Sequence, residues 1–194
     1  MTTPITGETW GDEIDGVRAY LLAEAEQPFS VLLPKLAAAH ADLLAALDSV
    51  SEEQAEFRPI AGEGEEGWGI AEVLRHIASI ETIMADRLRA LGIGDSVNRL
   101  TPTYPGYMES VDTRRLQALL KVMGDSHAAL LAAVTEIQGH ERLDAVAEHR
   151  RFGKLNCRAW LVMHALHLQD HARQISKTKA MDGYPRQRLV NPMP

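Results

Sequence analysis

The sequence predicts an all-α protein, a four-helix bundle with an extra N-terminal amphipathic helix. In four long segments, apolar residues recur every three or four positions, which is the period of a helix with one buried face. Hydrophobic residues make up 45% of the 194 residues and aromatic residues only 5%, so the apolar content is mostly Ala and Leu and favours helix over sheet. No segment shows the alternating pattern of a strand, and the length suits one domain with a single core.

The N-terminal helix is expected over residues 10–26, because apolar residues from Trp10 to Leu21 recur at helical spacing and Pro28 follows. Its apolar stripe is narrow, so we expect it to dock on the bundle or on a second subunit. The chain therefore divides into an N-terminal extension (residues 1–28), the bundle (residues 29–180) and a C-terminal tail (residues 181–194) that contains three prolines.

The four bundle helices are bounded by residues that typically begin or end helices. We expect them over residues 34–50, with Pro34 in the first turn; 69–91, ended by Gly92; 112–138, with Asp112 as N-cap; and 156–180, with Asn156 as N-cap. The first connection contains Ser51 and Gln54 at capping-box spacing and then a Gly- and Glu-rich loop, residues 61–67, which we expect to be solvated. Residues 92–111 are expected to form a long loop, and residues 152–155 a turn in the polar segment 140–155.

Charge and composition argue against several classes of protein. The net charge is −7 and no long basic block occurs, which argues against nucleic-acid binding because phosphate neutralisation needs clustered Lys and Arg. Cys157 is the single cysteine, so no intramolecular disulfide can form and a reducing, cytoplasmic location is expected. The N-terminus lacks the pattern of a signal peptide, and no run of 18 apolar residues predicts a membrane span.

Histidines stand out on the predicted inward faces. Six of the eight lie on these faces or at their edge: His40, His76, His127, His164, His167 and His171. Burying an imidazole without a partner costs a few kcal/mol, and one metal ion would satisfy several of them at once. Two histidines at positions i and i+4, as in the last helix, are a common grip on a metal ion. The alternative is a set of hydrogen-bonded core histidines; His140 and His149 lie in polar segments and are expected on the surface.

Two separate motifs resemble the DinB-like (damage-inducible) family. The first is Phe57-Arg58-Pro59 followed by residues 66–77, Glu-Gly-Trp-Gly-Ile-Ala-Glu-Val-Leu-Arg-His-Ile. The second is Phe152-Gly153-Lys154-Leu155, then Trp160-Leu161 and His167-x-x-x-His171-x-x-Gln174-Ile175. The resemblance covers most of the chain, from the first long helix to about Ile175. It implies a four-helix bundle that binds one divalent metal ion, nickel or zinc, through His76, His167 and His171, and that often forms a homodimer.

Other residues are candidates for the wall of the metal pocket or for contacts behind the ligands. These are His164, one turn before His167; His40 and His127, on the seams of two other helices; Gln174, one turn after His171; and Glu72, one turn before His76. Gln174 either hydrogen-bonds near the site or faces another helix. Glu72 either orients an imidazole or is an acid favoured in a first helical turn. Gly69 departs from the family, which usually has Ser or Thr there, and this departure removes a helix cap.

The resemblance also implies a function. Family members with a defined activity include S-transferases and isomerases that use low-molecular-weight thiols such as bacillithiol or mycothiol. We therefore expect a metal-dependent enzyme that activates a small thiol, or water, for transfer to a small electrophilic substrate. The alternatives are a metal-dependent hydrolase, a non-catalytic metal-binding stress-response protein, and a structural bundle with core histidines. Cys157 is expected to be a buried structural thiol, since it lies about 15 Å along the helix from His167.

Overall fold

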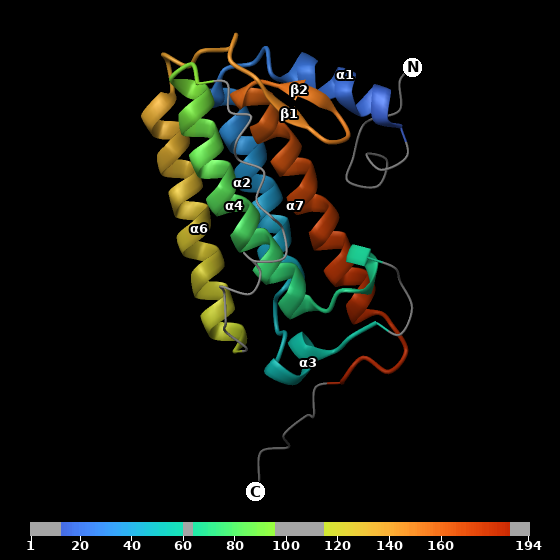
Figure 1. Cartoon of the computed structure of the whole chain (residues 1–194). Coiled ribbons are helices and arrows are strands. Elements are labelled where there is room, and N and C mark those ends of the chain that lie inside the picture. The colour runs from blue at the N-terminus through green and yellow to red at the C-terminus, as the bar shows by residue number, and fades with distance from the viewer. Residues whose placement is uncertain (1–12, 60–63, 96–114, 187–194) are drawn as a thin grey trace, which may run out of the picture.

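The computed structural model describes residues 13–59, 64–95 and 115–186, and confirms the predicted four-helix bundle (Figure 1). The bundle consists of the helices α2 (Phe29–Ala46), α4 (Ile70–Gly92), α6 (Leu116–Ile137) and α7 (Cys157–Lys179). Around it lie α1 (Ile14–Glu24), α3 (Glu52–Glu56), the 3-10 turn η1 (Gly64–Gly67) and the strands β1 (Ala147–His149) and β2 (Gly153–Leu155).

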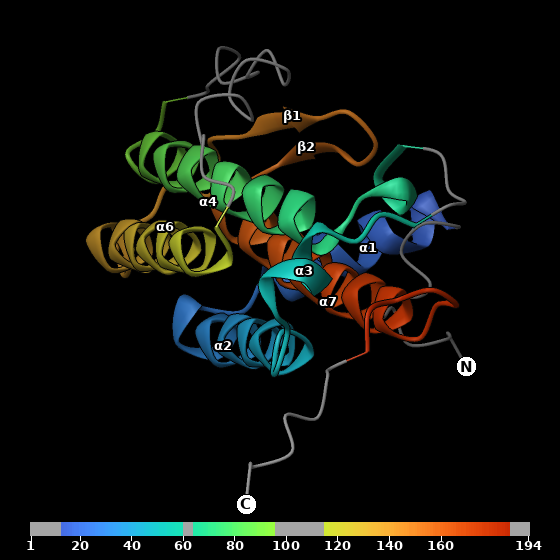
Figure 2. The same cartoon turned by 90° about the horizontal axis from the view of Figure 1, so that it is seen from below.

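The helices pack as two pairs. Helix α4 packs mainly against α6, α2 packs mainly against α7, and contacts between α4 and α7 join the two pairs. Seen along the bundle, α4 and α2 occupy opposite corners (Figure 2). The neighbours α2 and α6 approach each other least closely, and α1 lies across α7. The α4–α7 side therefore holds the two halves together, while the α2–α6 side is the loosest of the bundle.

Helix α2 begins earlier than predicted. It starts at Phe29 rather than at Pro34 and ends at Ala46 rather than at Val50. The buried side chains of Phe29 and Leu32 extend its apolar face toward the N-terminus. Pro34 consequently lies inside the helix, where it removes the one hydrogen bond that its missing N–H would donate.

Helix α6 begins later than predicted, at Leu116 with Arg115 as its N-cap rather than at Asp112, and ends at Ile137, one residue before the predicted end. Ser51 and Gln54 form the expected capping box, and the Asn156 side chain accepts a hydrogen bond from the Ala159 N–H at 2.9 Å. The predicted N-terminal helix is shorter, Ile14–Glu24, and α4 extends one residue to Gly92. Trp10, Asp112 and the loop residues 96–111 lie outside the described residues.

The prediction of no strand was wrong. Residues 147–149 and 153–155 form an antiparallel hairpin in which Ala147 pairs with Leu155 and His149 with Gly153. A three-residue loop joins the strands, and Gly153 at its end has φ +70°, the left-handed conformation that such loops require. Each strand is three residues long, which is too short to produce a readable alternation in the sequence.

His149 was also misplaced by the sequence analysis, because it is half-buried rather than on the surface. Its ring stacks on Phe152 with centroids 4.7 Å apart and meets Trp160 edge-on at 5.1 Å. Its Nδ1 accepts hydrogen bonds from the backbone N–H groups of Arg151 and Phe152, both at 3.2 Å. The neutral ring thus holds the hairpin turn and packs it on α7.

Gly69 is required by a close backbone approach. A Cβ at this position would lie 2.5 Å from the Phe57 carbonyl oxygen, a distance that real side chains do not adopt. The cap is supplied instead by Glu72, whose Oε2 accepts a hydrogen bond from the Gly69 N–H at 2.9 Å. The absence of Ser or Thr here therefore follows from the crossing of two chain segments at the start of α4.

Two helices, α2 and α6, are long and apolar enough by themselves to cross a membrane, with mean hydropathies of 1.3 and 1.2. Neither helix is an uninterrupted apolar run, because α2 contains Lys35 and Asp42 and α6 contains Lys121, Asp125 and Glu136. Both helices form sides of the bundle, and the core helix of a bundle passes the same test. The finding is weak support for a membrane span.

We predict that Gly69→Ser destabilises the protein by about 1–3 kcal/mol, because the new Cβ must displace the Phe57 backbone. Gly124→Ala is the matched control: it lies in the exposed interior of α6 with nothing within 4 Å of an added Cβ. The control should raise the free energy of unfolding by about 0.5–1 kcal/mol. Urea unfolding measures both, and equal stability of Gly69→Ser and the wild type would refute the close approach.

We also predict that His149 makes stability depend on pH. Burial, and then the charges of Arg87, Arg151 and Arg150, lower the pKa of His149 to about 4, against an ordinary value of about 6.5. Below pH 6.5 the unfolded chain therefore binds a proton that the folded chain does not. The contribution of His149 to stability is complete above that pH and is lost as the pH falls toward 4.

His149→Asn keeps an acceptor for the turn but does not titrate. Between pH 7.5 and 5.5, its unfolding free energy should fall by roughly 1 kcal/mol less than that of the wild type, since the ring is only half-buried. The exposed His140→Asn is the control and should keep the wild-type pH dependence. Identical pH slopes for His149→Asn and the wild type would contradict the proposed role.

Candidate metal centre

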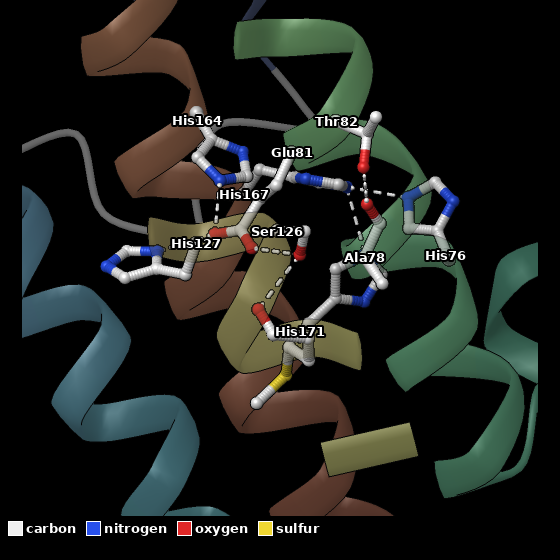
Figure 3. A network of polar contacts seen from close by, with 10 residues as sticks. His76, Ala78, Glu81, Thr82, Ser126, His127, His164, His167 and His171 are labelled. Carbon is white, nitrogen blue, oxygen red and sulfur yellow. Dashed lines mark hydrogen bonds and ion pairs between the residues drawn. The ribbon is translucent and has the colours of Figure 1, made fainter. Parts of the chain in front are cut away.

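Three imidazoles converge between α4 and α7. Helix α4 presents His76, and α7 presents His167 and His171 on successive turns of one face (Figure 3). The His167 Nε2 lies 3.1 Å from the His76 Nε2 and 2.9 Å from the His171 Nε2. His76 and His171 are each only 1% exposed, whereas His167 is half-buried. The structure thus brings together the three residues that the DinB resemblance designates as ligands.

The spacing of these nitrogens fits coordination of a single ion. Two nitrogens bound at about 2.1 Å, with an angle of about 90–110° between them, lie about 3.0–3.4 Å apart. The His171 Nδ1 lies 2.8 Å from the Gln174 Oε1, an acceptor, so it carries the ring proton and leaves the Nε2 lone pair free. Gln174, a candidate from the sequence, therefore orients one ring of the triad.

The electrostatics keep these rings neutral. Burial, and next the neighbouring His171, lower the pKa of His76 to about 3. Burial is also the main cause that lowers the pKa of His171 to about 4 and that of His167 well below its ordinary value. Metal ions bind the neutral form of imidazole, so at neutral pH protons compete weakly for these three nitrogens.

Glu65 is a fourth candidate donor that was not among the residues predicted from the sequence. One of its carboxylate oxygens lies within 4.8 Å of the ligand atoms of His76, His167 and His171. The turn that carries it is tied to α7, because the Gln174 Nε2 donates a hydrogen bond to the Glu65 carbonyl oxygen. Although the residue as a whole is exposed, partial desolvation of its carboxyl group, followed by the charge of Asp170, raises its pKa.

Two neighbours of the triad have structural roles. Trp68 packs on the side of His76, with ring centroids 4.9 Å apart. Glu72 does not orient a triad imidazole: its carboxylate caps Gly69 and pairs with Arg58. Of the two roles left open for Glu72 by the sequence, the structure favours that of an acid at the start of a helix.

The remaining three candidate histidines lie around a different residue, Glu81. The His127 Nδ1 lies 2.7 Å and the His164 Nε2 lies 3.2 Å from the Glu81 Oε1, and the His40 ring stacks on His127 with centroids 3.6 Å apart. Ser126 donates a hydrogen bond to the other carboxylate oxygen at 2.9 Å. His40, His127 and His164 therefore gather in a second polar cluster and do not complete the triad; Figure 3 shows His127 and His164 at Glu81.

Glu81 is fully buried, and it too was not among the residues predicted from the sequence. Burial by itself would raise the pKa of Glu81, but the hydrogen bonds and charges of His127 and His164 outweigh this effect and hold it at about 2. The carboxylate is therefore ionised. A signal existed in the sequence: Leu74, Ile77, Glu81, Met84 and Leu88 are spaced as one helical seam, and Glu81 is its single charged member.

Cys157 lies at the start of α7 and is fully buried, as expected for a structural thiol. Burial, and secondarily the charge of Glu141, raise its pKa to about 11. The reactive form of a cysteine is the thiolate, which this environment suppresses. The candidate chemistry is therefore that of the histidine triad.

Comparison with known proteins agrees with this fold. The family model of the DinB superfamily matches residues 35–175. The solved structure of TT2238, described as a four-helix bundle protein, is 22% identical with a TM-score of 0.51, over 78% of this chain and 98% of that chain. At this identity the likeness concerns the fold alone, and the chain has no significant match among curated proteins. Because the family match spans well over half of the chain and includes all three triad histidines, the protein belongs to the DinB superfamily.

Proposed function

We propose that this protein is a metal-dependent enzyme that activates a small thiol, or water, for transfer to a small electrophilic substrate. One divalent ion, nickel or zinc, would be held by His76, His167 and His171. The observation that carries the proposal is the approach of three imidazole Nε2 atoms at separations of 2.9 and 3.1 Å. Three neutral nitrogen donors leave coordination positions open, which is the arrangement of a reactive rather than a structural metal site.

The bound ion would supply a Lewis acid that lowers the pKa of a small thiol or of water. Glu65 would accept the released proton, since its carboxylate is close to all three ligand atoms. Its raised pKa suits this task, because a base works best when its pKa approaches the working pH. Glu65 also lies on the exposed turn η1, so the proton can pass from it to solvent.

Substrate would approach at His167, the only half-buried member of the otherwise buried triad. Trp68 and the turn η1 border this approach, and Gln174 fixes the turn to α7. The two remaining proposals, a homodimer and a cytoplasmic location, rest on the family resemblance and on the single cysteine. Size-exclusion chromatography with light scattering tests the first of them.

We predict that freshly purified protein contains divalent metal and that His76→Ala and His171→Ala each remove one equivalent of it. Metal analysis by mass spectrometry measures this loss. The exposed His140→Ala controls for adventitious binding by surface histidines and should retain the wild-type content. Wild-type metal content in both triad variants, with folding preserved, would rule out the proposed ligands.

We predict that Glu65→Gln keeps the metal but lowers the rate of thiol conjugation by about 100-fold or more, the usual effect of removing a general base. Glu66→Gln, the exposed neighbour on the same turn, is the matched control and should retain activity. The assay uses a chromogenic electrophile with several small thiols. Equal rates for Glu65→Gln and Glu66→Gln would exclude Glu65 as the proton acceptor, and activity that survives complete removal of the metal would exclude the mechanism.

A further inference from the structure

We propose that the bundle contains a second metal site, formed by His40, Glu81 and His127, that binds a divalent transition-metal ion such as zinc. Each residue comes from a different helix: His40 from α2, Glu81 from α4 and His127 from α6. One candidate donor atom from each lies within 4.8 Å of the other two. Two imidazoles and one carboxylate are a ligand set that binds zinc and neighbouring divalent metals in other proteins.

The closest pair of donor atoms lies slightly nearer together than two ligands of one ion would. The His127 Nδ1 and the Glu81 Oε1 lie 2.7 Å apart, which is a hydrogen bond while His127 carries its proton on Nδ1. A neutral imidazole can move that proton to Nε2, so Nδ1 becomes a metal ligand without loss of a proton from the ring. A small increase in the 2.7 Å separation then gives the roughly 3 Å expected between two ligand atoms that each lie about 2.1 Å from one ion.

Two nitrogens at this cluster lack hydrogen-bond partners. Among the described residues, the buried His40 Nδ1 and His164 Nδ1 contact no donor or acceptor. An unsatisfied polar atom in the interior costs about 1–3 kcal/mol, so two such atoms at one place call for an explanation. One ring nitrogen of His40 belongs to the three-donor group, and to bind an ion through it the ring must rotate out of its stack on His127, because the lone pair of an imidazole nitrogen lies in the ring plane. His164 would act behind the ligands, since its Nε2 contacts Glu81 at 3.2 Å and positions that carboxylate.

The charge at the cluster also favours a cation. Glu81 is fully buried, and within the described ranges its ion pairs are with His127 and His164 and not with Lys or Arg. These histidines compensate the buried carboxylate only while one of them carries an extra proton, and a buried carboxylate without a positive partner is costly. A divalent ion bound by the carboxylate and two neutral imidazoles compensates that charge. The alternative is a purely hydrogen-bonded network in which a histidine proton supplies the positive charge.

An ion bound at the cluster would stabilise the contact of α2 with the rest of the bundle. Helices α2 and α6 approach each other least closely among the neighbouring bundle helices, and His40 stacks on His127 across that side. An ion bound to both rings and to Glu81 would tie α2 to the α4–α6 pair. His40 is half-buried, which gives the ion a path from solvent. Binding here does not depend on the triad, which lies on the α4–α7 side (Figure 3).

The test counts metal ions. The full chain, stripped of metal with a chelator, is dialysed against zinc, and bound zinc per chain is measured by mass spectrometry. We expect two equivalents in the wild type and one in the triad double variant His167→Ala/His171→Ala. We expect one equivalent in His40→Phe, which keeps a ring stacked on His127 but removes the donor. Glu81→Gln, which preserves the size of the side chain and the acceptor that faces both histidines but removes the charge, should also bind one.

The outcomes separate the two sites. Loss of one equivalent in His40→Phe and Glu81→Gln supports the second site even if the triad variant shows that the first proposal is wrong. A wild-type count of one that both variants leave unchanged overturns the second site and identifies the cluster as a hydrogen-bonded network. A count of two that both variants leave unchanged overturns it as well. Circular dichroism and urea unfolding of the metal-free variants establish that they fold, and zinc should raise the unfolding midpoint less in His40→Phe than in the wild type.

Discussion

The cost of burying imidazole rings governs the interior of this bundle. An apolar seam of Leu, Ile and Ala needs no particular partner, but each ring nitrogen removed from water does. The six inward-facing histidines gather in two groups, three at the contact of α4 with α7 and three around Glu81, and in the second group the Nδ1 atoms of His40 and His164 still lack a hydrogen-bond partner. Both groups require the same height and rotation of α4 and α7 relative to each other. The polar contacts therefore specify the register of helices whose apolar faces would accept several registers.

The fold was readable from the sequence because helical periodicity extends over many turns in each long segment. The ends of the helices were harder to predict from the sequence. Pro34 predicted a helix start, yet Phe29 and Leu32 gain enough burial to place that proline inside α2. The hairpin could not be read because its three-residue strands carry no period. His149 looked like a surface residue because its neighbours in sequence are charged, whereas its neighbours in space are Phe152 and Trp160.

At the site, the sequence designated the triad through the DinB motifs, and helical spacing supported only its i, i+4 pair. Spacing along a helix does not give the height at which helices meet, so His40, His127 and His164 could not be separated from the triad before the structure placed them. Glu81 was hidden because one charged residue on an apolar seam looks like an exception to the pattern. Its meaning depends on His127, 46 positions away in the chain. Glu65 was hidden for the opposite reason, since an acidic residue in a Gly- and Glu-rich loop resembles an ordinary solvated charge.

The turn η1, which carries Glu65, links the local backbone to the chemistry of the triad. Gly69, two residues after the turn η1, allows the Phe57 carbonyl to lie against the start of α4. The turn places Glu65 within 4.8 Å of the ligand atoms of the triad. Gln174 then serves both sides of the site, because its oxygen orients His171 and its nitrogen holds the Glu65 backbone. Ring orientation and the position of the acid consequently depend on one side chain. A change in the turn would therefore shift the His171 nitrogen that faces the other ligands. A change in His171 would likewise shift Glu65.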